Sequence, residues 1–93
     1  MAVLLITYDL NKGCGLYDGQ NYPGVLKIIK EYQNTRLSES SYAIDTPKTP
    51  TEIFNEIKPA IDKNDNLYII VLGSSRMGFA NDDVRNWLKD HLH

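Results

Sequence analysis

The chain has 93 residues, of which 42% are hydrophobic and 24% charged, and this composition predicts one globular domain spanning residues 1–93. The net charge of −2 provides no overall positive field, so any contact with nucleic acid must come from a local cluster of basic side chains. A single cysteine excludes an internal disulfide and is typical of a reducing compartment, and no apolar stretch is long enough for a membrane span. We therefore expect a cytoplasmic protein without a membrane partner.

Residues 2–9, "AVLLITYD", predict a buried β-strand. Side chains alternate between the two faces of a strand, and here both faces are largely apolar at the start. One face carries Leu4, Ile6 and Tyr8, and the other carries Val3, Leu5, Thr7 and Asp9. Such a strand is expected to be central in its sheet, or to have one face covered by a partner.

The next segments predict a loop, a helix and one or two strands. Residues 10–22 form a loop with three glycines, and Pro23 suits the first helical position because its missing N–H is no loss there. Apolar residues at helical spacing extend this helix to about residue 33. Residues 35–46 are strand-like with a polar middle and contain neither Asn-Gly nor Asp-Gly, the usual signals of a tight hairpin. They are compatible with one long bent strand or with two short strands that meet near Ser40.

The clearest local signal lies at the start of the second predicted helix. Thr49 followed by Glu52 is a capping box, and Pro50 occupies the first helical position. Pro59 is expected to kink or end this helix near Lys58, because proline removes a backbone donor and clashes with the preceding turn.

The last two elements complete an α+β pattern. Residues 67–73, "LYIIVLG", predict a second buried strand, and a final helix with an apolar stripe begins at about Asp82. If residues 35–46 split into two strands, the order matches a ferredoxin-like βαββαβ fold with an additional C-terminal helix. We expect an antiparallel sheet with one face covered by helices and the other open. An open apolar face on a small domain favours a homodimer, and Asp9 would lie at the edge of its interface.

Asp9, the last residue of the first strand, is the main chemical candidate. An aspartate in this position commonly caps the following turn, here by accepting backbone N–H bonds from Asn11 or Lys12. Alternatively, Asp9 is a ligand of Mg²⁺, which proteins usually bind through one or two carboxylates together with waters and substrate phosphates. A two-fold axis would then supply the second carboxylate from the partner's Asp9.

Two glycine-containing segments do not fit nucleotide-binding motifs. "GSSRMG" (73–78) has the glycine spacing of a phosphate-binding loop, but Phe79 and Ala80 stand where Lys and Ser/Thr are required. "GCGLYDG" (13–19) has its third glycine one place too late for a dinucleotide site. The basic residues nearest the first helix form either a solvated surface or a local patch along the Asp9 edge: Lys12, Lys27, Lys30 and Arg36.

Four segments together, "LLITYDLN", "LSESSYAI", "EIFNEIKPAIDKNDNLYIIVL" and "VRNWLKDHL", resemble the small adaptation protein of CRISPR systems, and especially its divergent endonuclease-like branch. The virulence-associated protein D ribonuclease toxins are more distantly similar. The resemblance implies a ferredoxin-like fold and a symmetric dimer with facing sheets, in which the first-strand aspartate binds a divalent metal. By that motif Asp9 matches the metal ligand and Tyr8 its neighbour, while Ser40 and Tyr42 match the Ser-x-aromatic pattern of the second strand. Members commonly carry arginines shortly after the aspartate, where this chain offers Lys12.

The first functional hypothesis is therefore a Mg²⁺- or Mn²⁺-dependent nuclease that acts on RNA or DNA as a homodimer. Two Asp9 carboxylates would hold one metal ion, which activates water and stabilises charge on the scissile phosphate. Tyr8 and Ser40 are the further catalytic candidates, and the nucleic-acid-binding candidates are Lys12, Arg36 and Tyr42. The alternatives are a non-catalytic dimeric module that binds nucleic acid or protein, and a toxin-like ribonuclease.

Overall fold

The computed structural model describes residues 2–9, 23–61, 65–73 and 78–92 and has a four-stranded antiparallel sheet with three α-helices. The strand order in the sheet is β2-β3-β1-β4, and every neighbouring pair is antiparallel. The strands are β1 (Ala2–Asp9), β2 (Gln33–Ser38), β3 (Ser41–Thr46) and β4 (Asn66–Leu72). The predicted α+β class is confirmed, and the interleaved βαβ units are consistent with a ferredoxin-like fold.

Two helices connect the strands on one side of the sheet. Helix α1 (Pro23–Ile29) is shorter than predicted, because the chain turns after it and β2 already begins at Gln33. Helix α2 (Pro50–Ile57) begins with the predicted capping box: the Thr49 hydroxyl accepts from the backbone N–H of Glu52 at 3.2 Å. The Glu52 carboxylate in turn accepts from the backbone N–H of Thr49 at 3.1 Å. Proline then acts as predicted, since the α-helix gives way to a 3₁₀ turn, η1 (Lys58–Ala60).

The polar segment before α2 is a hairpin and not one bent strand. Strands β2 and β3 pair antiparallel and are joined by a two-residue turn at residues 39–40, with a bulge between Arg36 and Ser38. The turn is held against the end of β1, because the backbone N–H of Tyr8 donates to the carbonyl of Ser40 at 3.0 Å. This long-range contact replaces the favourable turn sequence that the segment lacks.

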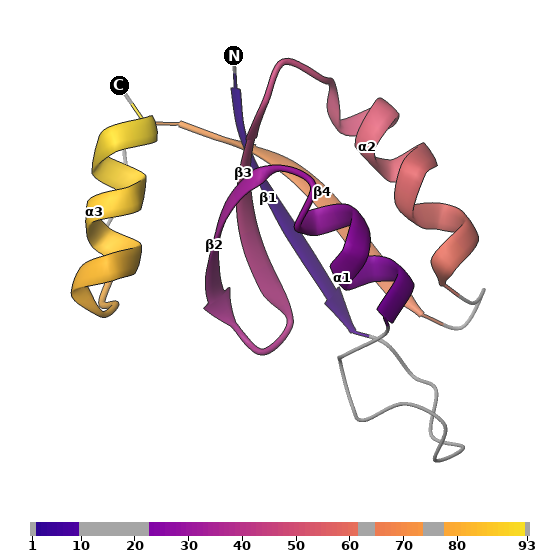
Figure 1. Ribbon diagram of the computed structural model, residues 1–93, viewed down its shortest axis with the longest axis horizontal. Helices are drawn as coiled ribbons and strands as arrows, with labels where there is room; N and C mark the ends of the chain where they lie inside the picture. Colours follow the sequence, from indigo (N-terminus) through magenta and orange to yellow (C-terminus); the bar gives the residue numbers. More distant parts are fainter. Residues whose placement is uncertain (1, 10–22, 62–64, 74–77, 93) are drawn as a thin grey trace.

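The hydrophobic core lies between the sheet and the pair of helices α1 and α2 (Figure 1). Its members come from the helix-facing positions of β1 and β3 and from the inner sides of the two helices. The fully buried aliphatic side chains are Leu4, Ile6, Ile44, Val25, Ile29, Ile53 and Ile57. The alternation of side chains predicted for the first strand is therefore the one observed.

Helix α3 (Asp82–His91) lies across the sheet from α1 and α2 (Figure 1), over the half of the second face formed by β2 and β3. His91 Nδ1 is 2.5 Å from Asp45 Oδ2, and Asp45 shares its face with Val3 through the β1–β3 register. The ring of His91 also stacks on Trp87, with centroids 3.9 Å apart. The face predicted to be open is thus partly covered, because the apolar stripe of α3 must itself be buried.

Replacing Thr49 by alanine removes the hydroxyl that caps α2, and we expect it to lower the free energy of unfolding by about 1 kcal/mol. Thr51→Ala is the matched control, since Thr51 is exposed in the same first turn and makes no cap. Urea denaturation of both variants measures the difference. Equal losses in the two variants would contradict a role for the capping box.

Candidate functional site

Asp9 is exposed at the end of the central strand, on the sheet face opposite the core. In the β1–β4 register Asp9 lies opposite Asn66, and Thr7 lies opposite Tyr68. On the other side of β1, Thr7 lies opposite Ser41, and their hydroxyl oxygens are 3.1 Å apart. A row of polar side chains therefore adjoins Asp9 on this face.

Sequence reasoning did not select three of these neighbours, namely Asn66, Ser41 and Tyr68. Alternation along the first strand already placed Thr7 on the face of Asp9. The other residues come from β3 and β4, and only the strand register brings them there. No local motif in the sequence carries that information.

Ser40, predicted as a catalytic residue, lies beside the end of β1. Its carbonyl accepts the backbone N–H of Tyr8, and its own N–H donates to the Ser38 hydroxyl at 3.3 Å. The structure therefore brings the turn of the β2–β3 hairpin next to the strand end that carries Asp9. The resemblance placed Ser40 and Asp9 in one site, and the backbone of Ser40 contacts Tyr8, the residue before Asp9.

Tyr8 and Tyr42 point into the core, on the face opposite Asp9. They are 4% and 6% exposed, and no described residue provides a hydrogen-bond partner for the Tyr8 hydroxyl. Burial raises the pKa of Tyr8 to about 12, with further increases from Tyr42 and Glu39 and a partial opposing effect of Arg36. The Tyr8 hydroxyl thus stays protonated at neutral pH and does not supply a general base.

The two predicted basic residues differ in what the structure describes. Arg36 is exposed, lies opposite Tyr42 in the hairpin, and donates from Nε to the carbonyl of Ser38 at 3.1 Å. It is therefore exposed near the turn, but on the face of Tyr42, opposite the face of Asp9. Lys12 lies outside the described residues.

The donors around Asp9 suit a hard divalent cation, and the described residues supply two of them. A carboxylate from Asp9 and an amide oxygen from Asn66 are the types of ligand that Mg²⁺ and Mn²⁺ prefer. Among the described residues, no three His, Cys, Asp or Glu side chains come together as a metal-binding group. Asp9 and Asn66 are therefore the metal-type donors that the described part of this row supplies.

A partly apolar and partly exposed surface lies on the same face as Asp9. We call it the β1–β4 patch and define it by Leu5, Thr7, Tyr68 and Ile70. Tyr68 is 71% exposed and Ile70 47%, whereas α3 covers the β2–β3 half of this face. Tyr68 and Ile70 thus form a small exposed area on the same face as Asp9.

No known protein-family model matches the chain. Among the described helices, none is long and apolar enough to cross a membrane. The function is therefore inferred from Asp9 and its surroundings.

Replacing Tyr8 by phenylalanine removes a buried hydroxyl that has no partner among the described residues, so we expect the stability at pH 7 to stay equal or rise by up to ~1 kcal/mol. The raised pKa means that the folded chain holds this proton more tightly than the unfolded chain. Stability therefore declines as the pH rises from 10.0 towards about 12, and the variant lacks this part of the decline.

Urea denaturation at neutral and alkaline pH measures both effects, with the exposed Tyr68→Phe as the control. A loss of more than about 1 kcal/mol in the Tyr8 variant at pH 7 would show that the hydroxyl makes a stabilising hydrogen bond.

Proposed function

We propose that the protein is a metal-dependent nuclease that acts as a homodimer, with the Asp9 carboxylates of two subunits sharing one Mg²⁺ or Mn²⁺. The observation that carries the proposal is the position of Asp9, exposed at the end of the central strand and on the same face as the β1–β4 patch. Pairing of two such patches would bury Tyr68 and Ile70 and bring two strand ends towards one axis. The small CRISPR adaptation protein that the sequence resembles follows the same plan.

The chain's own oxygen donors define the role of each residue at this centre. The Asp9 carboxylates of the two subunits would hold the metal, with the Asn66 amide oxygen within the same row of the sheet. When bound, the metal supplies a Lewis acid for the phosphate and lowers the pKa of an attacking water. Ser40 lies beside this strand end and would position the substrate.

Tyr8 and Tyr42 serve this site from the opposite face. Their rings anchor the end of β1 and the start of β3 in the core, and the Tyr8 N–H holds the hairpin turn in place. In our proposal Tyr8 and Tyr42 are positioning residues. Exposed basic side chains would contact the nucleic acid. Lys12 and Arg36 would provide that positive charge, which a chain of net charge −2 must concentrate locally; Arg36 belongs to the face of Tyr42, so it would contact nucleic acid around the hairpin turn.

A second candidate function is a non-catalytic dimeric module that binds nucleic acid or protein. It is favoured by the small donor set, since Asp9 is the single carboxylate in the described polar row. A toxin-like ribonuclease would use the same chemistry as the first candidate on RNA alone. A cytoplasmic location, in keeping with the single cysteine of the sequence, is part of the proposal for each candidate function.

Asp9→Asn keeps the size and hydrogen-bonding capacity of the side chain but removes its charge, so we expect metal-dependent cleavage to be lost while the fold and dimer persist. Labelled single-stranded RNA and duplex DNA are incubated with Mg²⁺, Mn²⁺ or EDTA. Asp90→Asn, an exposed acid in the last turn of α3, is the matched control and should cleave like the wild type.

Two other outcomes would contradict the proposed nuclease. Equal cleavage by wild type and Asp9→Asn would assign the activity to a contaminant and contradict the Asp9 site. Absence of metal-dependent cleavage in a wild-type protein that is an intact dimer would favour the binding module.

A further inference from the structure

Strand β4 forms one edge of the sheet, and its outer side has no partner strand among the described residues. It runs for seven residues, "NLYIIVL", without a charge, a proline or a bulge. Three of its large side chains are exposed: Tyr68 at 71%, Ile70 at 47% and Val71 at 58%. An edge of this kind is a template for pairing with another strand.

The opposite edge of the sheet shows the protection that β4 lacks. Strand β2 is mostly polar, carries the charged Arg36, and is broken by the bulge between Arg36 and Ser38. These devices are the ones by which edge strands avoid pairing with other chains. Within one small sheet, β4 therefore lacks the protection that β2 has.

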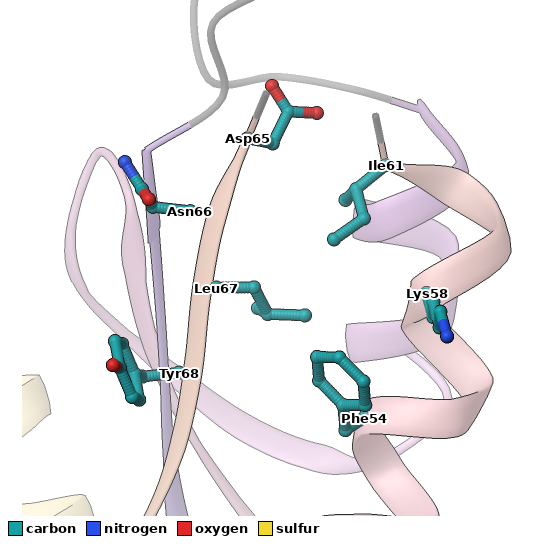
Figure 2. A pocket seen from close by; sticks show the side chains of 7 residues that line it. All are labelled: Phe54, Lys58, Ile61, Asp65, Asn66, Leu67 and Tyr68. Atoms are coloured by element: carbon teal, nitrogen blue, oxygen red, sulfur yellow. The ribbon is translucent and has the colours of Figure 1, made fainter. Parts of the chain in front are cut away.

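A groove lies beside the first part of β4, with Leu67 on its helix-covered side. It has a volume of about 450 Å³ and lies between β4 and the α2–η1 segment. Figure 2 shows Phe54, Ile61 and Leu67 pointing into this space, whereas Tyr68 points to the other side of the strand. A strand added beside β4 would therefore have room for its apolar side chains next to Leu67.

We infer that the outer edge of β4 pairs with β4 of a second copy of this chain, joining two sheets into one of eight strands. A two-fold axis perpendicular to the sheet makes the two β4 strands antiparallel and keeps the helix pairs of both copies on one side. With Ile69 at the axis, Tyr68 faces the partner's Ile70, and Leu67 faces the partner's Val71.

This register is favoured because every exposed side chain of β4 gains an apolar neighbour. Aromatic and β-branched residues opposite one another are favourable cross-strand pairs, which suits Tyr68 and the partner's Ile70. The partner's Val71 would enter the groove beside Leu67. Because β4 carries no charged residue, two β4 strands can pair without repulsion between like charges. A second copy of the chain is therefore a suitable partner for this edge.

The edge pairing is separate from the proposed Asp9 dimer. Because the two β4 strands are antiparallel, the Asp9 residues of the two copies lie at opposite ends of the joined strands and cannot share a metal. Val71 faces the helix side through its pairing with Leu4, whereas Asp9 lies on the other face. The two contacts can therefore be disrupted independently.

The test is Val71→Lys in the full chain, which places a charge on the edge without touching the face of Asp9. We expect the wild type to associate, as measured by sedimentation over a concentration series. In the variant, the dissociation constant of the edge contact should be at least about tenfold larger. Leu37→Lys is the matched control, because Leu37 is 42% exposed on the protected edge strand β2 and should associate like the wild type. Circular dichroism checks that all three proteins are folded.

Amide hydrogen exchange provides a readout that needs no variant. Protection of β4 amides that rises with protein concentration supports the pairing, and protection of β4 that is independent of concentration overturns it. Equal association of wild type and Val71→Lys also overturns it. If Asp9→Asn abolishes cleavage and leaves the protection of β4 unchanged, the Asp9 site and the β4 edge contact are separate, as inferred.

Discussion

Strand β1 is hydrogen-bonded on both sides and apolar on both faces. The other strands pair with its two sides, and the helices bury most of its apolar side chains. Its pairing with β3 and β4 builds the centre of the sheet. Its first face is buried by α1 and α2, where Leu4 and Ile6 are fully covered. Its second face is shared, with α3 over the β2–β3 half and the β1–β4 patch beside it. A domain of this size has few other sources of stability, so both faces of its central strand matter.

At the end of β1, two neighbouring residues have different roles, one structural and one chemical. Successive residues of a strand point to opposite faces, so Tyr8 enters the core while its neighbour Asp9 faces solvent. Burial of Tyr8 fixes the strand end and, through its backbone, the turn that carries Ser40. An acid held at the rim of a rigid central strand is well placed for binding a cation, and the proposed dimer would complete the ligand set.

Local patterns predicted the elements that depend on local chemistry. The alternation in the first strand and the capping box of α2 both hold, because these signals involve neighbouring residues. The sequence does not decide between a hairpin and a bent strand, because residues 39–40 have no preferred turn sequence. The turn is instead held by a contact to Tyr8. The apolar stripe of α3 indicated burial, but its covering surface depends on contacts such as His91 to Asp45, 46 residues apart.

The candidate site, like the fold, was predictable from the sequence only where local alternation determines it. The place of Asp9 on the face opposite Tyr8 followed from the strand period alone. Asn66 and Ser41 were missed because they reach Asp9's row only through the register of β4 and β3. Tyr42 entered through the resemblance, but pairing with Ile6 places it in the core.

The central claim is that two Asp9 carboxylates share one metal ion, and its most direct test is the stoichiometry of Mn²⁺ binding. Titration of the purified chain with Mn²⁺, followed by the electron paramagnetic resonance signal of the free ion, counts the bound metal per chain. A metal ion shared by two Asp9 carboxylates predicts one bound Mn²⁺ for every two chains, with binding abolished by Asp9→Asn. One Mn²⁺ per chain, or binding that survives this substitution, would contradict it.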